Sequence, residues 1–185
     1  MKPYLVLPRG RLRPIAAEDL EDFERLLHRA EVKRFLCDDQ VLGRHDVSSI
    51  LKENLLLDRN GLGLWVIELE QCKFAGVVGL APVTPVLAQS SIMREQIEVT
   101  VALHSELFGQ GVAFNALSQI INHAKLGLNL SKVVAAVDLP NTRSHRLLDR
   151  AGFISHGQID GPANPLILYV LELNGKNEKR DSWIV

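Results

Sequence analysis

Two glycines, Gly109 and Gly111, stand between a strand-like segment and a helical one, and they constrain the fold more than any other feature of the chain. The segment before them, IEVTVALH, alternates as a half-buried strand does, and the segment after them has the pattern of an amphipathic helix. The apolar stripe of that helix is predicted to consist of Phe114, Leu117, Ile121, Ala124 and Leu128. Glycines at such a junction let a ligand approach the backbone, and the free N–H groups of a first helical turn attract anions. The loop is therefore either a phosphate cradle or a plain tight turn with a close helix–strand contact.

Two common nucleotide-binding loops do not fit this segment. A dinucleotide fingerprint needs GxGxxG directly after the first strand, and an acidic residue at the end of the next strand. Here the pattern is GxGxA, the strand lies past the middle of the chain, and Asp138 comes too late to contact a ribose. The P-loop pattern GxxxxGK[ST] is absent from the sequence. A phosphate bound here therefore belongs to a different fold.

The other segments predict a single α/β domain. The segment RLRPIAAEDLEDFERLLHRA, residues 11–30, begins extended and then becomes helical. Further helical patterns cover 32–36, 45–58 and 142–151, and strand-like patterns cover 62–70, 73–83, 97–104, 132–138, 152–159 and 165–173. The first two long strands are separated by a tight connection near Gln71, which predicts a hairpin. No repeat or linker interrupts the chain, so we expect one domain over 1–185, with a tail over 174–185 polar enough to be loose.

Composition narrows the class of ligand. A formal net charge of -1 gives no electrostatic footprint for a polyanion, so nucleic acid is not expected as a partner. The apolar run Leu5–Leu7 is too short for a signal peptide or a membrane span, so we expect a cytoplasmic protein without a membrane partner. Cys37 and Cys72 lack the spacing of a metal site or a redox pair, and no metal is expected. The sequence is compatible with a homodimer as well as with a monomer.

The neighbours of the glycine loop favour the phosphate cradle. The string LFGQGVAFNALSQIINHA, followed by VVAAVDLPNTRSHRLLDRAGF, resembles the GNAT superfamily of acetyl-CoA-dependent N-acetyltransferases, whose signature is (Q/R)xxGx(G/A). Gly111 and Ala113 fill the fourth and sixth positions of that signature. Asn141 matches a downstream asparagine of the family, and Gly152–Phe153 matches its closing pair.

The N-terminal part extends this resemblance. The segment LRPIAAEDLEDFERLLHRAEVKRFL is similar to the opening of the ribosomal-protein N-terminal acetyltransferase branch, the RimJ/RimL type, so the resemblance covers 12–173. Phe108 replaces the Gln or Arg of the first signature position, and an aromatic residue there is frequent in this branch. Leu148 stands where many GNAT proteins have a tyrosine that is proposed as general acid, so that role does not transfer.

The resemblance implies a fold and a ligand. The fold would be the GNAT fold, an α/β structure with a mixed, mostly antiparallel twisted sheet of about seven strands, flanked by helices and splayed at its centre. Acetyl-CoA would be the cosubstrate, with its pantetheine arm in the splay and its diphosphate on the glycine loop. The implied cofactor-binding residues are Val101, Ala102, Leu103, Phe108, Gly109, Gln110, Gly111, Val112, Ala113, Phe114 and Asn141.

Acetyl transfer to an amine requires loss of a proton from the amine, stabilisation of an oxyanion and protonation of the departing thiolate. Glu98 matches a glutamate of the family and shares its strand face with Thr100, so it is the predicted base, acting through water. The alternative for Glu98 is a solvated strand carboxylate. Ser144 matches a serine that would lie near the sulfur as acid, and its alternative is a first-turn residue that satisfies backbone amides.

The predicted activity is N-acetyl transfer by direct attack in a ternary complex, without a covalent enzyme intermediate. The acceptor is either a protein N-terminus or a small-molecule amine, and the sequence does not identify it. The alternative from a different class is a degenerate GNAT module that binds acyl-CoA as a sensor or partner without catalysis. This alternative is kept because Leu148 replaces the tyrosine that is proposed as general acid in many GNAT proteins.

Overall fold

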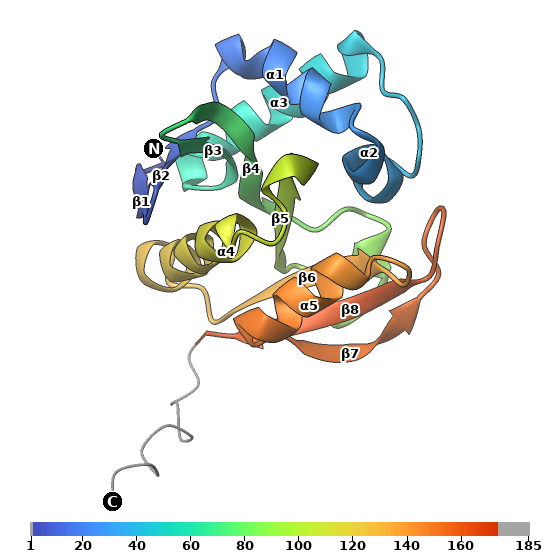
Figure 1. The fold of residues 1–185 in the computed structure, drawn as a ribbon. Helices are drawn as coiled ribbons and strands as arrows, with labels where there is room; N and C mark the ends of the chain where they lie inside the picture. The colour runs from blue at the N-terminus through green and yellow to red at the C-terminus, as the bar shows by residue number, and fades with distance from the viewer. Residues whose placement is uncertain (1, 174–185) are drawn as a thin grey trace, which may run out of the picture.

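The computed structural model describes residues 2–173, which form an open sheet with helices on both faces (Figure 1). The strands are β1 (Leu5–Leu7), β2 (Gly10–Pro14), β3 (Gly63–Leu69), β4 (Cys72–Pro82), β5 (Ile97–Leu103), β6 (Lys132–Asp138), β7 (Ile154–Ile159) and β8 (Leu166–Glu172). The helices are α1 (Leu20–Leu27), α2 (Ala30–Leu36), α3 (Arg44–Leu57), α4 (Val112–Asn122) and α5 (Thr142–Ala151). The predicted loose tail over 174–185 lies outside the described residues.

The sheet has eight strands in the order β1-β2-β3-β4-β5-β6-β8-β7. The expected mixed, mostly antiparallel sheet is confirmed, and so is the β3–β4 hairpin, in which Leu69 pairs with Cys72. The count of about seven strands was short by one. The additional strand, β1, forms a hairpin with β2 in which Leu5 pairs with Leu12.

The sheet splays between β5 and β6, its one parallel pair among the described strands. These two strands pair only at Glu98 and Val134. By contrast, β5 pairs with β4 along all of Ile97–Leu103, and β6 pairs with β8 along all of Lys132–Asp138. Beyond Glu98, the facing edges of β5 and β6 are therefore not paired with each other, and the sheet is open at its centre.

Helices cover the two faces of the sheet unequally. Helices α4 and α5 lie on one face, and α1, α2 and α3 lie on the other (Figure 1). The buried stripe of α4 and its continuation consists of Ala116, Leu117, Ile120 and Ala124. Two other members of the predicted stripe, Ile121 and Leu128, are half-buried and pack against the core, whereas the prediction was wrong at Phe114, which is half-buried and does not. Phe114 lies in the first turn of α4, beside the opening between β5 and β6. Its side chain therefore lines a cavity and does not pack on the sheet.

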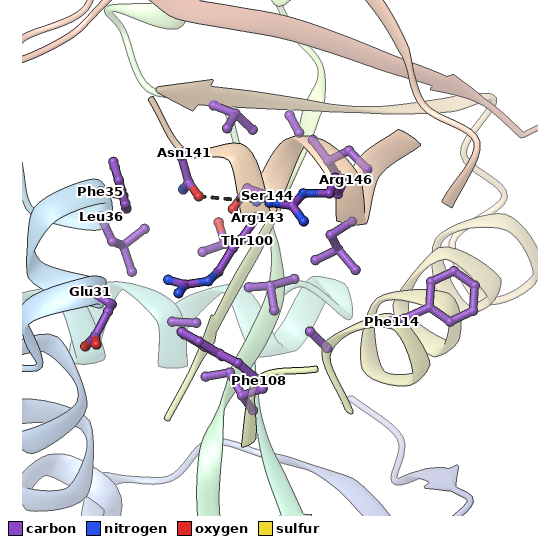
Figure 2. Close-up of a pocket in the computed structure, with 18 of the residues that line it drawn as sticks. Glu31, Phe35, Leu36, Thr100, Phe108, Phe114, Asn141, Arg143, Ser144 and Arg146 are labelled. Atoms are coloured by element: carbon purple, nitrogen blue, oxygen red, sulfur yellow. Dashed lines mark hydrogen bonds between the residues drawn. The ribbon is translucent and has the colours of Figure 1, made fainter. Parts of the chain in front are cut away.

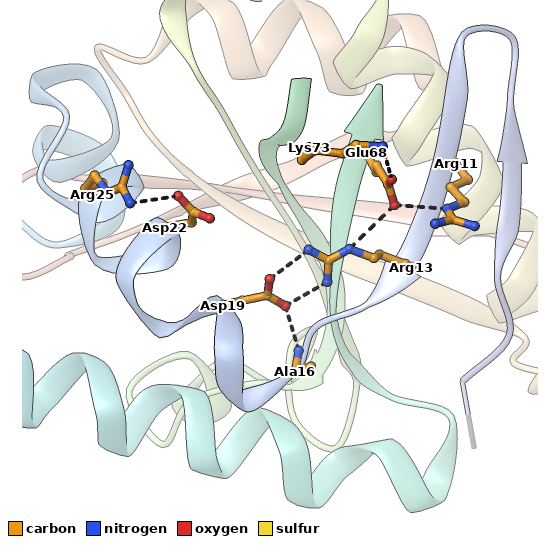
Figure 3. Close-up of polar contacts among 8 residues, drawn as sticks. All are labelled: Arg11, Arg13, Ala16, Asp19, Asp22, Arg25, Glu68 and Lys73. Atoms are coloured by element: carbon orange, nitrogen blue, oxygen red, sulfur yellow. Dashed lines mark hydrogen bonds and ion pairs between the residues drawn. The ribbon is translucent and has the colours of Figure 1, made fainter. Parts of the chain in front are cut away.

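A polar network holds the N-terminal helical layer on the sheet (Figure 3). The buried carboxylate of Asp19 accepts two hydrogen bonds of 2.7 Å from the Arg13 guanidinium and one of 2.8 Å from the Ala16 backbone N–H. Glu68 on β3 accepts a hydrogen bond of 2.9 Å from Arg11, whose guanidinium lowers the pKa of that carboxyl. The network thereby fixes the start of the helical segment that leads to α1 and α2 against β2 and β3.

Candidate active site

A cavity of about 660 Å³ opens where β5 and β6 diverge. Its walls come from β5, β6, the glycine loop with the start of α4, the start and one face of α5, and α2 from the opposite layer (Figure 2). Small-molecule and cofactor sites occupy roughly 300–1,000 Å³. The cavity therefore has the size of a site for an extended small ligand, and it reaches both helical layers.

The glycine loop forms an open side of this cavity. Gly109 and Gly111 have φ angles of 74° and 76°, in the left-handed region that favours glycine. A Cβ built on either residue would meet no atom within 4 Å, whereas one on Gly76 would lie 2.2 Å from the Ala102 carbonyl oxygen. The alternative of a turn with a close helix–strand contact is therefore wrong. Gly111 is the N-cap of α4, so the N–H groups of the first turn are available to an anion beside the open loop.

Helix α5 supplies positive charge to the opposite wall. Arg143, Arg146 and Arg150 all line the cavity. The Arg143 guanidinium lies 4.9 Å from the ring centroid of Phe108, and that of Arg150 lies 4.0 Å from the ring centroid of Phe114. These cation–π contacts join α5 to the glycine loop and to α4, and they bring the guanidinium groups to the side of the cavity where the α4 N-terminus lies. This end of the cavity is suited to a ligand that carries phosphates.

Glu98 closes the β5–β6 ladder. Its Oε1 accepts a hydrogen bond of 3.2 Å from the Ala136 N–H, a donor that would bond a β5 carbonyl in a continuous parallel ladder. Glu98 as a whole is half-buried, but its carboxyl group is enclosed by protein. This burial raises the pKa of Glu98 to about 7. The hydrogen bond from Ala136 favours the charged form and opposes the shift. Glu98 does not line the cavity itself, whereas its neighbours Val99 and Thr100 do.

The comparison with known families identifies this architecture. A model of the acetyltransferase (GNAT) domain matches residues 9–154. This chain belongs to the GNAT family of acetyltransferases. A search of curated proteins found no match.

Solved structures show the same GNAT fold at low sequence identity. A putative GNAT-family acetyltransferase from Bordetella pertussis is 19% identical, with a TM-score of 0.77 over 91% of this chain and 99% of that one. RimL, a ribosomal L7/L12 α-N-protein acetyltransferase solved with coenzyme A, is 15% identical, with a TM-score of 0.75 over 92% and 98%. A putative acetyltransferase, yncA, from Salmonella typhimurium, solved with acetyl-CoA, is 20% identical, with a TM-score of 0.67 over 89% and 94%. At these identities the likeness supports the fold and does not assign the branch within the family.

The GNAT fold brings all but one of the predicted cofactor-binding residues to the wall of one cavity. They are Val101, Ala102, Leu103, Phe108, Gly109, Gly111, Val112, Ala113, Phe114 and Asn141. The exception is Gln110, whose side chain donates a hydrogen bond of 2.9 Å to the Glu106 carbonyl and which lines a second cavity of about 390 Å³. The loop turns the Gln110 side chain away from its glycine neighbours, so only its backbone remains for the predicted role.

Ser144 and Asn141 lie together at the start of α5 (Figure 2). The Asn141 Oδ1 caps this GNAT helix by accepting a hydrogen bond of 3.2 Å from the Ser144 N–H. Among residues 2–173, the Ser144 hydroxyl has no hydrogen-bond partner, and the residue lines the cavity. The capping function that was the alternative for Ser144 is thus performed by Asn141. Leu148, buried in the same wall, has no proton to donate.

Two parts of the GNAT cavity were missed from the sequence. The arginines of α5 recur at 143, 146 and 150, a helical spacing that places them on one face and was visible in the sequence. The wall formed by Glu31, Phe35 and Leu36 of α2 had no such signal, because it depends on how α2 docks against β5.

Neither cysteine lines this cavity. Cys37 is buried at the end of α2, and its burial raises the pKa of the thiol, which disfavours the reactive thiolate. Cys72 begins β4 and lines the second cavity. Within residues 2–173, no group of three His, Cys, Asp or Glu side chains is arranged to hold a metal ion. In the same range, no helix is both long and apolar enough to span a bilayer.

Proposed function

We propose that the chain is an acetyl-CoA-dependent N-acetyltransferase in which an amine attacks the thioester directly in a ternary complex. The observation that carries the proposal is one continuous cavity, which joins an open glycine loop and three arginines at one end to the splay beside Glu98. The GNAT family membership and the coenzyme complexes of RimL and yncA support acetyl-CoA as the acyl donor.

The residues of the cavity suit the parts of this donor. The diphosphate would bind to N–H groups between Gly109 and Phe114, with positive charge supplied by Arg143 and Arg150. The pantetheine arm would lie in the splay, where backbone groups of Val101 to Leu103 face the gap left by β6. Asn141 retains its amide N–H₂ group to donate, because capping uses only Oδ1.

The reaction exchanges a C–S bond for a C–N bond. The amine nitrogen, as a free base, attacks the carbonyl carbon, and the thiolate leaves when the tetrahedral intermediate collapses. Glu98 would take the amine proton through a water molecule, since its pKa of about 7 matches a base that works near neutral pH. The departing thiolate would gain a proton from the Ser144 hydroxyl or from water. An N–H of Val101 to Leu103 would stabilise the oxyanion.

The likeness to RimL makes an α-amine the favoured acceptor class within this proposal. One observation favours a second candidate, a GNAT module that binds acyl-CoA without catalysis. Leu148 occupies the cavity wall with an aliphatic side chain that can neither donate nor accept a proton.

Two measurements separate these candidates. Calorimetric titration with CoA and acetyl-CoA tests the donor site, and a thiol-release assay over amines and peptides tests catalysis. Binding with turnover supports the enzyme, and binding without turnover of any amine or peptide supports the module. A folded protein that binds neither form of coenzyme contradicts both.

A further inference from the structure

The cavity has a second end of different chemistry, formed by α2. Glu31 and Phe35, one helical turn apart, line it together with Leu36 (Figure 2). This wall offers one carboxylate and three apolar side chains, those of Val32, Phe35 and Leu36, whereas the wall formed by α5 offers three guanidinium groups. The two ends therefore suit different ligands: an anion at α5, and an amine beside an apolar group at α2.

Helix α2 is held firmly enough to form a binding wall. Val32 and Cys37, at 7% and 8% exposure, anchor its inner side in the core shared with α1 and α3. At its start, Arg29 forms an ion pair of 3.0 Å with Glu106, in the turn that precedes the glycine loop. The buried inner side of α2 thus places the face that carries Glu31 toward the predicted donor site, and the exposed Arg29–Glu106 pair adds a contact between the two.

The charges around this wall disfavour a polycation. Lys33 is engaged with Asp39 at 2.9 Å. The Arg34 guanidinium lies 5.0 Å from the Phe35 ring centroid, and Arg143 reaches into the cavity from the opposite wall (Figure 2). A ligand with several ammonium groups would meet Arg143 inside the cavity, but a single ammonium can pair with Glu31 and leave its apolar part on Phe35.

We propose that the α2 wall is the acceptor subsite, and that it selects a monoamine whose ammonium group is flanked by an apolar or aromatic group. The inference rests on the proposed acetyl transfer and names the substrate class of that reaction. Glu31 attracts the ammonium group, Phe35 and Leu36 cover the apolar group, and the amine then loses its proton before it attacks. The same chemistry is presented by a free alkyl or aryl-alkyl amine and by a peptide whose first side chain is apolar.

The test is a thiol-release assay with acetyl-CoA and a matched panel of acceptors. The small-molecule arm contains leucinamide and 2-phenylethylamine, and the peptide arm contains peptides that differ only in a first residue of Leu, Ser or Asp. Spermidine and kanamycin represent polycations. We expect the lowest KM for the apolar members, and the better of the two arms identifies the source of the amine. A preference for spermidine or kanamycin overturns the inference.

Variants of α2 assign the effect to its residues. Phe35→Ala is expected to raise the KM for apolar amines roughly tenfold, with kcat and the Kd of acetyl-CoA unchanged, and Phe35→Leu should restore much of it. Glu31→Gln is expected to raise KM about two- to fivefold, less at high salt. Leu56→Ala and Glu53→Gln, exposed positions on α3 that do not line the cavity, are the matched controls and should change nothing.

The outcomes distinguish this inference from the proposed function. If acetyl-CoA does not bind, the proposed function fails and the inference fails with it. If acetyl-CoA binds and amines are acetylated, but Phe35→Ala and Glu31→Gln leave every KM unchanged, only the inference fails. Donor binding without turnover of any apolar amine or peptide also overturns it.

Discussion

Glu98 Oε1 accepts a hydrogen bond of 3.2 Å from the Ala136 N–H, beside the single residue pair that joins β5 to β6. A carboxylate side chain thus stands where a backbone carbonyl would continue the sheet. Burial of that carboxyl raises the pKa of Glu98 to about 7. The feature that ends the strand pairing therefore also holds an ionisable group next to Val99 and Thr100, which line the cavity, and it connects the fold to the proposed chemistry.

The first prediction concerns Glu98 in catalysis. In the native enzyme, kcat should rise with pH up to about 7, where the carboxyl becomes ionised, and then level off. Glu98→Gln keeps an oxygen that can accept from Ala136 but cannot take a proton, so it should lower the plateau kcat by roughly 10²–10⁴-fold and abolish the rise. The Kd of acetyl-CoA should stay nearly the same. Full turnover in the variant would transfer the role of base to water.

The second prediction concerns the same residue and stability. Because the folded-state pKa of Glu98 lies above the unfolded value near 4.5, the folded protein binds the proton more tightly, and ionisation destabilises it. This contribution is present below about pH 4.5 and is lost as pH rises through about 7. Urea unfolding of the native protein and of Glu98→Gln should show the variant gaining relative stability over this window, by at most about 3 kcal/mol. Parallel stability curves would contradict the raised pKa.

The third prediction concerns the glycine loop. Gly111→Asp places a carboxylate where the diphosphate would bind, so affinity for CoA should fall at least about 100-fold, a loss typical of an unfavourable buried charge. The left-handed φ of 76° adds some backbone strain, but the fold should survive, because a Cβ at Gly111 meets no atom within 4 Å and Asp tolerates this region better than most residues.

Two further variants isolate the cause of that loss. Gly157→Asp is the matched control, since Gly157 also has a positive φ of 116° and open space but lies on β7, away from the cavity. It should destabilise the fold without loss of CoA binding. Gly111→Ala adds the Cβ without the charge, so it should weaken CoA binding much less. Calorimetry that finds unchanged CoA affinity in folded Gly111→Asp would remove the donor-site assignment.

The fourth prediction is that no cysteine forms an acyl-enzyme. Cys37 is buried with a raised pKa, and Cys72 lines a different cavity from the one proposed for the thioester. The double variant Cys37→Ala, Cys72→Ala should therefore keep near-normal turnover, and initial-rate patterns should intersect, as expected for a ternary complex. Intact-mass analysis after mixing with acetyl-CoA alone provides the independent check. A stoichiometric acetyl adduct that an amine can discharge would establish a covalent route instead.

Much of the architecture could be predicted from local sequence patterns. The runs KVVAAVD and TRSHRLLDRA have the bounds of β6 and α5, because alternation and helical spacing are properties of consecutive residues. The additional strand β1 escaped prediction, because a three-residue strand has too little alternation of its own and becomes a strand only by pairing with β2.

Sequence by itself determined the glycine loop, its place between β5 and α4, and the resemblance that predicted the donor site, because each depends on residue types at short, defined spacings. Only the tertiary structure decided which side chains reach the cavity. Phe114 leaves the core for the cavity wall, Gln110 turns to a second cavity, and α2 supplies Glu31 and Phe35 from a distant part of the chain. The raised pKa of Glu98 was likewise decided only by the tertiary structure. It reflects the burial of the carboxyl group and a hydrogen bond from Ala136, which lies on the neighbouring strand. Solvent exclusion and contacts between segments far apart in the sequence exist only after the chain has packed.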